Sequence, residues 1–148
     1  MNEKTECKSS VTLLKECDAG VKMAIKSIDD ILDHASDEKL KEILEEARKR
    51  HVNLKSDIEK MLAAGGEDEK EPNPIATGMA YMKTNIKITM EDDDRVVADL
   101  ITDGCNMGIK SLSRYLNKHR DASEEIKELA KKLIKSEEEL LVAVRPYL

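Results

Sequence analysis

The chain of 148 residues is long enough to bury one hydrophobic core and fits a single domain, residues 1–148. Charged residues make up 38% of it, hydrophobic residues 40% and aromatic residues only 2%, so the core must consist of aliphatic side chains. A β-sandwich or barrel normally contains more aromatic and β-branched residues. This composition therefore favours amphipathic helices and an all-α fold.

The charge distribution excludes several classes of partner. The formal net charge is −6, and no run of Lys and Arg is interleaved with aromatic residues, so we expect no nucleic-acid binding. No stretch reaches the 18 or more apolar residues of a membrane span, and the start MNEKTECKSS lacks the apolar region of a signal peptide. We therefore expect a cytoplasmic protein with no membrane partner and with its three cysteines reduced.

The first part of the chain predicts a helical hairpin. After a start at residues 1–8 that we expect to be disordered, apolar residues recur every three or four positions from Leu14 to Ala35. Ser36 and Asp37 can cap the next helix, which shows the same spacing from Leu40 to Met61. Gly65 and Gly66 then end it, because glycine readily adopts the left-handed conformation after a helix.

The middle of the chain predicts a long connection. Residues 64–74 are acidic and contain two prolines, so we expect an exposed linker there. Apolar residues at helical spacing then predict a short helix over Ile75–Met90. Such a helix would be about 24 Å long and could run along most of a bundle.

The last part of the chain predicts a second hairpin. The acidic residues 91–94 suit the start of a third main helix, whose apolar stripe runs from Val97 to Leu116. Asp121 and Ser123 can cap the fourth main helix, and Pro146 prevents its continuation.

The two predicted hairpins resemble each other in sequence. Residues 40–54 align without gaps to residues 126–140, and the pattern CDAGVK (residues 17–22) returns as CNMGIK (residues 105–110). A duplicated hairpin predicts a four-helix bundle, in which the glycine of each pattern would let two helices approach closely. The long connection favours a ferritin-like crossover, and an up-down-up-down order is the alternative.

Two ionisable residues, His51 and Glu137, occupy positions on the apolar stripes. Hairpin geometry places Cys17 level with His51, and Cys105 level with Glu137. If all four converge, two thiolates, an imidazole and a carboxylate could bind tetrahedral zinc, or iron. The simpler interpretation is a buried hydrogen bond between His51 and Glu137 beside two cysteines that behave as apolar residues. Thiol redox chemistry is the third interpretation.

The paired patterns LLKECDAGVK and LITDGCNMGIK, with the acidic linker and the crossover, resemble a family of small bacterial ferritin-like bundles classed as a domain of unknown function. The resemblance covers about residues 9–145 and implies a ferritin-like four-helix bundle without a known activity. Di-iron relatives have Glu-x-x-His on the second and fourth helices. Here Arg48 stands three residues before His51, and no histidine lies near Glu137, so the di-iron ligand set is incomplete.

No catalytic motif is present, so we predict a non-enzymatic helical bundle that acts by association, either as a homo-oligomer or with a protein partner. The alternative is a metal-binding or metal-handling bundle. Its ligands would be Cys17, His51, Cys105 and Glu137, and its metal would be zinc or iron. We expect no other cofactor.

Overall fold

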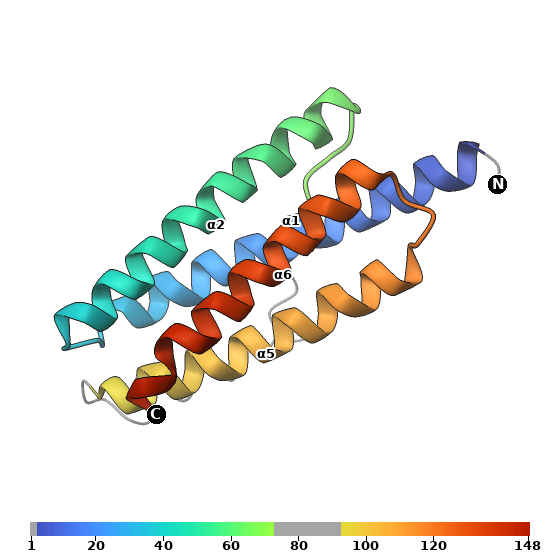
Figure 1. Ribbon diagram of the computed structural model, residues 1–148. Helices are drawn as coiled ribbons and strands as arrows, with labels where there is room; N and C mark the ends of the chain where they lie inside the picture. The colour runs from blue at the N-terminus through green and yellow to red at the C-terminus, as the bar shows by residue number, and fades with distance from the viewer. Residues whose placement is uncertain (1–2, 73–92) are drawn as a thin grey trace.

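The computed structural model describes residues 3–72 and 93–148. Within these ranges the secondary structure is entirely helical (Figure 1). The predicted helix over Ile75–Met90 lies outside the described residues. The helices are α1 (Glu3–Leu32), α2 (Glu38–Ala64), α5 (Asp94–Lys118) and α6 (Glu124–Val144), and a 3₁₀ turn, η1, follows at Arg145–Tyr147.

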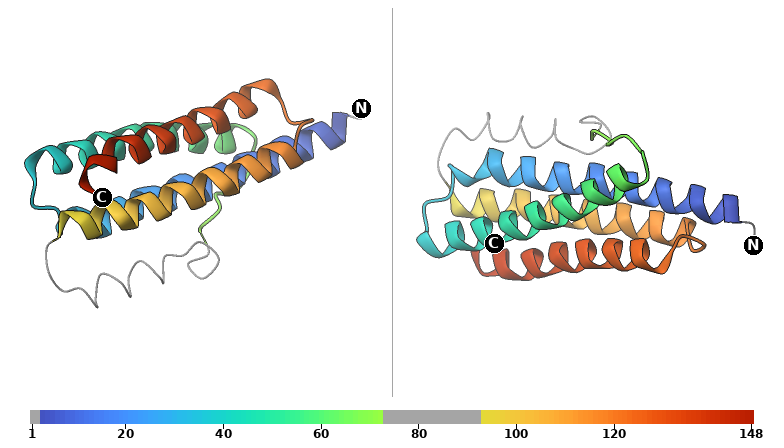
Figure 2. Two further views of the ribbon diagram at one scale, coloured as in Figure 1. Left: turned by 60° about the horizontal axis from the view of Figure 1, so that its bottom comes forward. Right: turned by 90° about the horizontal axis from the view of Figure 1, so that it is seen from above.

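The helices form a four-helix bundle made of two antiparallel hairpins. α1 pairs with α2, and α5 pairs with α6 (Figures 1 and 2). The hairpins pack so that α5 lies against α1, and α6 lies against α2. Figure 1 shows that α2 ends at the end of the bundle opposite to the start of α5. This order excludes the up-down-up-down alternative, and the ferritin-like crossover helix stays a prediction.

The start of α1 differs from the sequence prediction. We expected residues 1–8 to be disordered, but the helix begins at Glu3. Ser10 is buried, and its Oγ accepts a hydrogen bond of 2.8 Å from the backbone N–H of Ser123. This tertiary contact fixes the turn around Ser10, and helical hydrogen bonding can propagate from a fixed turn at little further cost.

The other helix ends lie close to their predicted positions. Asp37 caps α2, because its carboxylate accepts a 2.9 Å hydrogen bond from Leu40 N–H. Gly66 follows α2 with φ of 69°, the left-handed conformation expected of a glycine. Asp93 caps α5 through Arg95 N–H, and Pro146 lies in the 3₁₀ turn that follows α6. Ser123 precedes α6 but forms no side-chain cap.

The core consists of two apolar clusters along the bundle axis. The first cluster lies toward the α1–α2 turn, and the second lies toward the α5–α6 turn. His51 and Glu137 are buried between them, because their helical neighbours on one side belong to the first cluster and on the other side to the second. The first cluster includes Ile31, Leu40, Ala47, Val97 and Leu140, and the second includes Leu13, Val21, Ile58, Leu112 and Leu133.

The linker that follows α2 turns back onto α1. Asp18 of α1 is fully buried, and its Oδ2 accepts hydrogen bonds from Lys70 N–H at 2.9 Å and from Lys22 Nζ at 3.0 Å. Lys22 also pairs with the linker residue Glu71 at 3.0 Å. Residues 64–72 of the predicted acidic linker are described, most of them are exposed, and these contacts attach them to α1.

Candidate functional site

His51 and Glu137 meet at the interface of α2 and α6. Their Nε2 and Oε1 atoms are 2.6 Å apart, and His51 is completely buried. Nδ1 of His51 lies 2.7 Å from the carbonyl oxygen of Ala47. The buried hydrogen bond between these two residues, one of the three interpretations drawn from the sequence, is confirmed.

The hydrogen bonds define the charge of this pair. A carbonyl oxygen can only accept, so Nδ1 of His51 must carry a proton and donate it to Ala47. The short contact between Nε2 and Oε1 requires one further proton, held either by the imidazole or by the carboxyl group. In both cases the pair carries no net charge. A neutral pair can stay buried between two apolar clusters at far lower cost than a lone charge.

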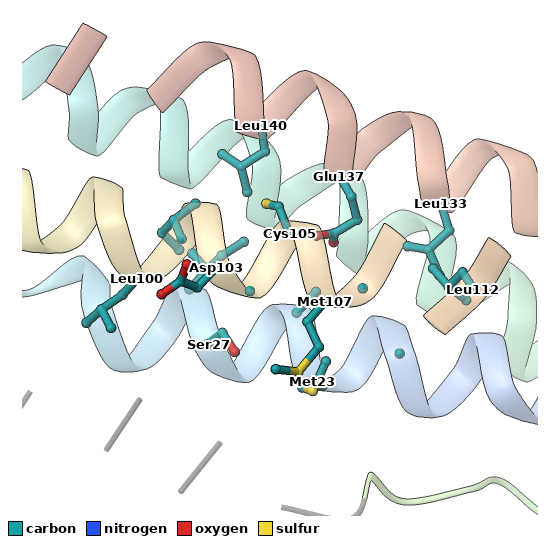
Figure 3. Close-up of a pocket in the computed structure, with 16 residues that line it drawn as sticks. Met23, Ser27, Leu100, Asp103, Cys105, Met107, Leu112, Leu133, Glu137 and Leu140 are labelled. Atoms are coloured by element: carbon teal, nitrogen blue, oxygen red, sulfur yellow. The ribbon is translucent and has the colours of Figure 1, made fainter. Parts of the chain in front are cut away.

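Cys105 lies beside this pair, as the hairpin geometry predicts. Its side chain is next to that of Glu137 (Figure 3). Burial raises the pKa of the Cys105 thiol, and the adjoining Glu137 carboxyl raises it further. Cys105 is therefore held as a thiol, which is a poor metal ligand and a poor nucleophile.

Cys17 is not level with His51, so this part of the hairpin prediction is wrong. Across the first hairpin Arg48 faces Asp29 and Glu59 faces Asp18, so His51 is level with a part of α1 between Asp18 and Asp29. Cys17 belongs to the second cluster, whereas Cys105 belongs to the first. Burial, followed by repulsion from the Glu16 and Asp18 carboxylates, raises the pKa of the Cys17 thiol to about 12. The two repeated patterns thus place their cysteines in opposite halves of the bundle, because α1 and α5 run antiparallel.

The four predicted ligands do not form one metal-binding group. His51, Glu137 and Cys105 come together without Cys17, and both ring nitrogens of His51 are already engaged. Among the described residues, Asp18, Glu59 and Glu69 are the group of three whose candidate ligand atoms lie within 4.8 Å of one another. Binding of zinc or iron at the predicted residues stays a prediction.

A cavity of about 60 Å³ lies between α1, α5 and α6, with Glu137 and Cys105 among its lining residues (Figure 3). A single water needs about 10–15 Å³ by a comparable measure, and a cavity that binds benzene has about 150 Å³, so a short aliphatic group fits this space. Most of the lining is apolar. An apolar cavity with a few polar groups is the usual form of a ligand site.

Glycines form part of the cavity wall, but the helices are not packed so closely there that a larger residue would clash. A Cβ at Gly20 would lie 3.7 Å from Leu112 Cδ2, and a Cβ at Gly108 would lie 3.5 Å from Glu137 Oε2. Both are ordinary van der Waals distances. The predicted close approach is therefore wrong, and these glycines, together with Gly104, leave space that side chains would reduce.

The cavity adjoins a positively charged groove on α5. Met23 and Met107 line both the cavity and this groove, and Met107 is 41% exposed. The groove continues along Lys110, Arg114 and Lys118, which are spaced four residues apart. None of these three cations forms an ion pair with the described part of the chain. At the other end of the cavity, burial and then repulsion from Asp99 raise the pKa of Asp103.

The sequence alone did not identify this cavity. Two signals were available: glycines at positions 104 and 108, one helical turn apart, and cations at every fourth residue from Lys110 to Lys118. Neither signal shows which helix will face these residues. Only the packing of α5 against α1 brings Met23 next to Met107.

Comparison with known proteins gives no match: no family model, curated protein or solved structure is significantly similar to this chain. The ferritin-like resemblance therefore stays a prediction. No helix within the described ranges is long and apolar enough to cross a membrane.

Proposed function

We propose that the protein is a non-enzymatic four-helix bundle that binds a small amphipathic anion, a molecule with an apolar body and a carboxylate or similar head. The observation that supports this proposal is the continuity of the apolar cavity with the cationic groove, through Met23 and Met107. The apolar body would occupy the cavity, and the head would lie against Lys110 and Arg114.

The charges around the cavity support this orientation. Glu137 does not repel an apolar or anionic ligand strongly, because its pair with His51 is neutral overall. The Asp103 carboxyl lies toward the end of the cavity away from Lys110 on α5. An anionic head is therefore favoured at the end that carries Lys110, Arg114 and Lys118.

Association through a broad protein interface has less support. Large exposed apolar residues are Val52, Met107, Val142 and Leu148, and they come from different elements of the described chain. A stable interface usually has a contiguous apolar centre. Homo-oligomer formation or binding of a protein partner stays a prediction, and sedimentation equilibrium over a range of protein concentrations would test the first.

The experiment compares three ligands with the same short apolar chain: pentanoate, pentanol and pentylamine. We expect pentanoate to bind most tightly in calorimetric titrations and pentylamine to bind most weakly. The double variant Lys110→Ala/Arg114→Ala should weaken pentanoate binding by about tenfold and leave pentanol binding nearly unchanged. Ala24→Leu, which adds volume to the cavity lining, should weaken both.

The matched control is Lys49→Ala/Lys60→Ala, which removes two exposed cations from α2 and should not change binding. Equal affinity for pentanoate and pentylamine would contradict the role of the groove. No binding of any of the three ligands would contradict the proposed function.

A further inference from the structure

The hydroxyl of Ser136 has no hydrogen-bond partner in the described structure, although Ser136 is only 5% exposed. A serine or threonine within a helix usually satisfies its hydroxyl with the carbonyl four residues earlier. Thr12 does so with Lys8 at 2.9 Å, and Thr102 does so with Ala98 at 2.7 Å. Ser136 does not, and it lines a groove between α2 and α6.

Arg50 presents a second unsatisfied donor to the same groove. Its Nε is buried without a partner in the described structure. α2 and α6 run antiparallel and touch at His51 and Glu137, and Arg50 and Ser136, the residues that precede these two, both line the groove between the helices. Arg48, two residues earlier on α2, pairs with Asp29, whereas Arg50 Nε has no such partner among the described residues.

Unpaired cations surround these two donors. Lys132 and Lys135 line the groove and form no ion pair with the described residues, whereas Lys127 and Lys131 on the same helix pair with Glu124 and Glu128. The amide of Asn53 also lines the groove. Leaving buried donors unsatisfied is costly, and a ligand with several acceptor oxygens would remove that cost.

Two carboxylates limit what the groove can accept. Asp57 and Glu139 line it as well, and neither pairs with a cation of the described chain. Three cations and two carboxylates leave a single excess positive charge. The groove is therefore suited to a small anion that reaches the buried donors between the carboxylates, rather than to an extended polyanion.

We propose that this groove between α2 and α6 binds a small tetrahedral oxyanion of the phosphate type. Arg50 Nε and Ser136 Oγ would donate hydrogen bonds to it, and Lys132 and Lys135 would neutralise its charge. Phosphate suits this set because its oxygens accept several charge-assisted hydrogen bonds at once. The site lies on the face opposite to the cavity between α1 and α5, so it is independent of the amphiphile site.

The test is a titration of the full chain with inorganic phosphate at constant ionic strength, in which the backbone amide NMR shifts report binding. We expect saturable shifts around Arg50 and Ser136 at lower phosphate concentrations than any shifts around Lys110. Arg50→Gln should weaken binding by about tenfold or more, because it removes the charged donor. Glu139→Gln should strengthen binding, because it removes a repelling charge.

Ser136→Ala distinguishes a ligand contact from a packing defect. The variant removes an unsatisfied buried hydroxyl, so its melting temperature should not fall, while its phosphate affinity should decrease several-fold. The matched controls are Arg48→Gln and Lys131→Ala, whose side chains are already paired. Unchanged affinity in both Arg50→Gln and Ser136→Ala would overturn the proposal and show only non-specific ionic binding, as would the absence of saturable shifts.

The source of the oxyanion is resolved by two further probes, glycerol 3-phosphate and vesicles containing phosphatidic acid. Tighter binding of glycerol 3-phosphate than of inorganic phosphate would identify a phosphate monoester. Tighter binding of the vesicles would identify a lipid headgroup. Either result supports the oxyanion site only if Arg50→Gln weakens that binding too.

Discussion

At the scale of single residues, His51 and Glu137 can be buried at the centre of the core because the proton they share leaves the pair without net charge. Removing either side chain would leave the other one buried without a hydrogen-bond partner, which is strongly destabilising. The two residues should therefore behave as one unit when they are substituted.

A double-mutant cycle tests this coupling. We expect His51→Leu and Glu137→Met each to lower the free energy of unfolding by about 3–5 kcal/mol, since each leaves one buried polar partner unpaired. The double variant should be within about 1 kcal/mol of the original protein, because apolar residues replace the whole pair. Urea unfolding measures all four states. Additive losses in the double variant would show that the two residues are not coupled.

The cysteines should differ in reactivity. Cys7 is exposed, whereas Cys17 and Cys105 are buried and burial raises the pKa of both thiols. In the folded protein near neutral pH, we expect a maleimide to modify Cys7 rapidly and the other two only after unfolding. Intact mass measured over time, with and without urea, follows the adducts. Rapid modification of Cys17 or Cys105 in the folded state would revive thiol redox chemistry as an interpretation.

At the scale of the helices, Gly20 weakens α1 without a steric need, since an added Cβ meets only ordinary contacts. We expect Gly20→Ala to raise the free energy of unfolding by about 0.5–1 kcal/mol, the usual gain of alanine over glycine within a helix. Gly66→Ala is the contrasting variant: φ at Gly66 is 69°, so a Cβ should cost about 1–2 kcal/mol. Thermal unfolding of both variants measures these effects, and destabilisation by Gly20→Ala would show that the space is needed.

The cap of α2 is linked to the C-terminal turn. Asp37 accepts a 2.7 Å hydrogen bond from the Tyr147 hydroxyl besides its bond from Leu40 N–H. The hydrogen bond from Tyr147, followed by that from Leu40, lowers the pKa of Asp37 in the folded state. A lowered pKa stabilises the fold above the ordinary value of about 3.9, and this contribution is lost as the pH falls through the folded-state pKa.

This linkage predicts a pH-dependent effect of Tyr147→Phe. The variant should be less stable than the original protein at neutral pH, and the difference should shrink on acidification as Asp37 becomes protonated. Urea unfolding at neutral pH and near pH 3 compares the two proteins. A difference that is the same at both pH values would assign the effect to packing of the ring instead of to the hydrogen bond.

At the scale of the whole molecule, hydrogen bonds join the two hairpins at both ends of the bundle. Asp94 of α5 accepts hydrogen bonds from the backbone N–H groups of Ser36 at 2.7 Å and Asp37 at 3.1 Å, while Ser10 and Ser123 meet at the other end. Because both core clusters contain residues from both hairpins, we expect a single cooperative unfolding transition.

Asp94→Ala tests this connection between the hairpins. The variant should lower the free energy of unfolding by about 1–3 kcal/mol, since two backbone donors lose a charged acceptor. Asp99→Ala, an exposed carboxylate on the same helix, is the control and should have little effect. Calorimetry measures both stability and cooperativity. Two separate transitions in the original protein would mean that the hairpins unfold independently.

The sequence by itself predicted the four long helices, the Asp37 cap, the glycines after α2 and the burial of His51 and Glu137. These features depend on local chemistry and on the spacing of apolar residues, which a helix repeats every turn. The start of α1 was predicted wrongly because the contact of Ser10 with Ser123 joins residues far apart in the chain.

Only the tertiary structure decided which residues face one another across the bundle. Hairpin geometry placed Cys105 beside Glu137 correctly but placed Cys17 wrongly, because counting from the middle of a turn does not fix the register of two packed helices. It gave no register between the hairpins, so the sequence could not decide among the three interpretations of His51 and Glu137, and it could not predict the cavity between α1 and α5. That register depends on how side chains from distant segments pack together.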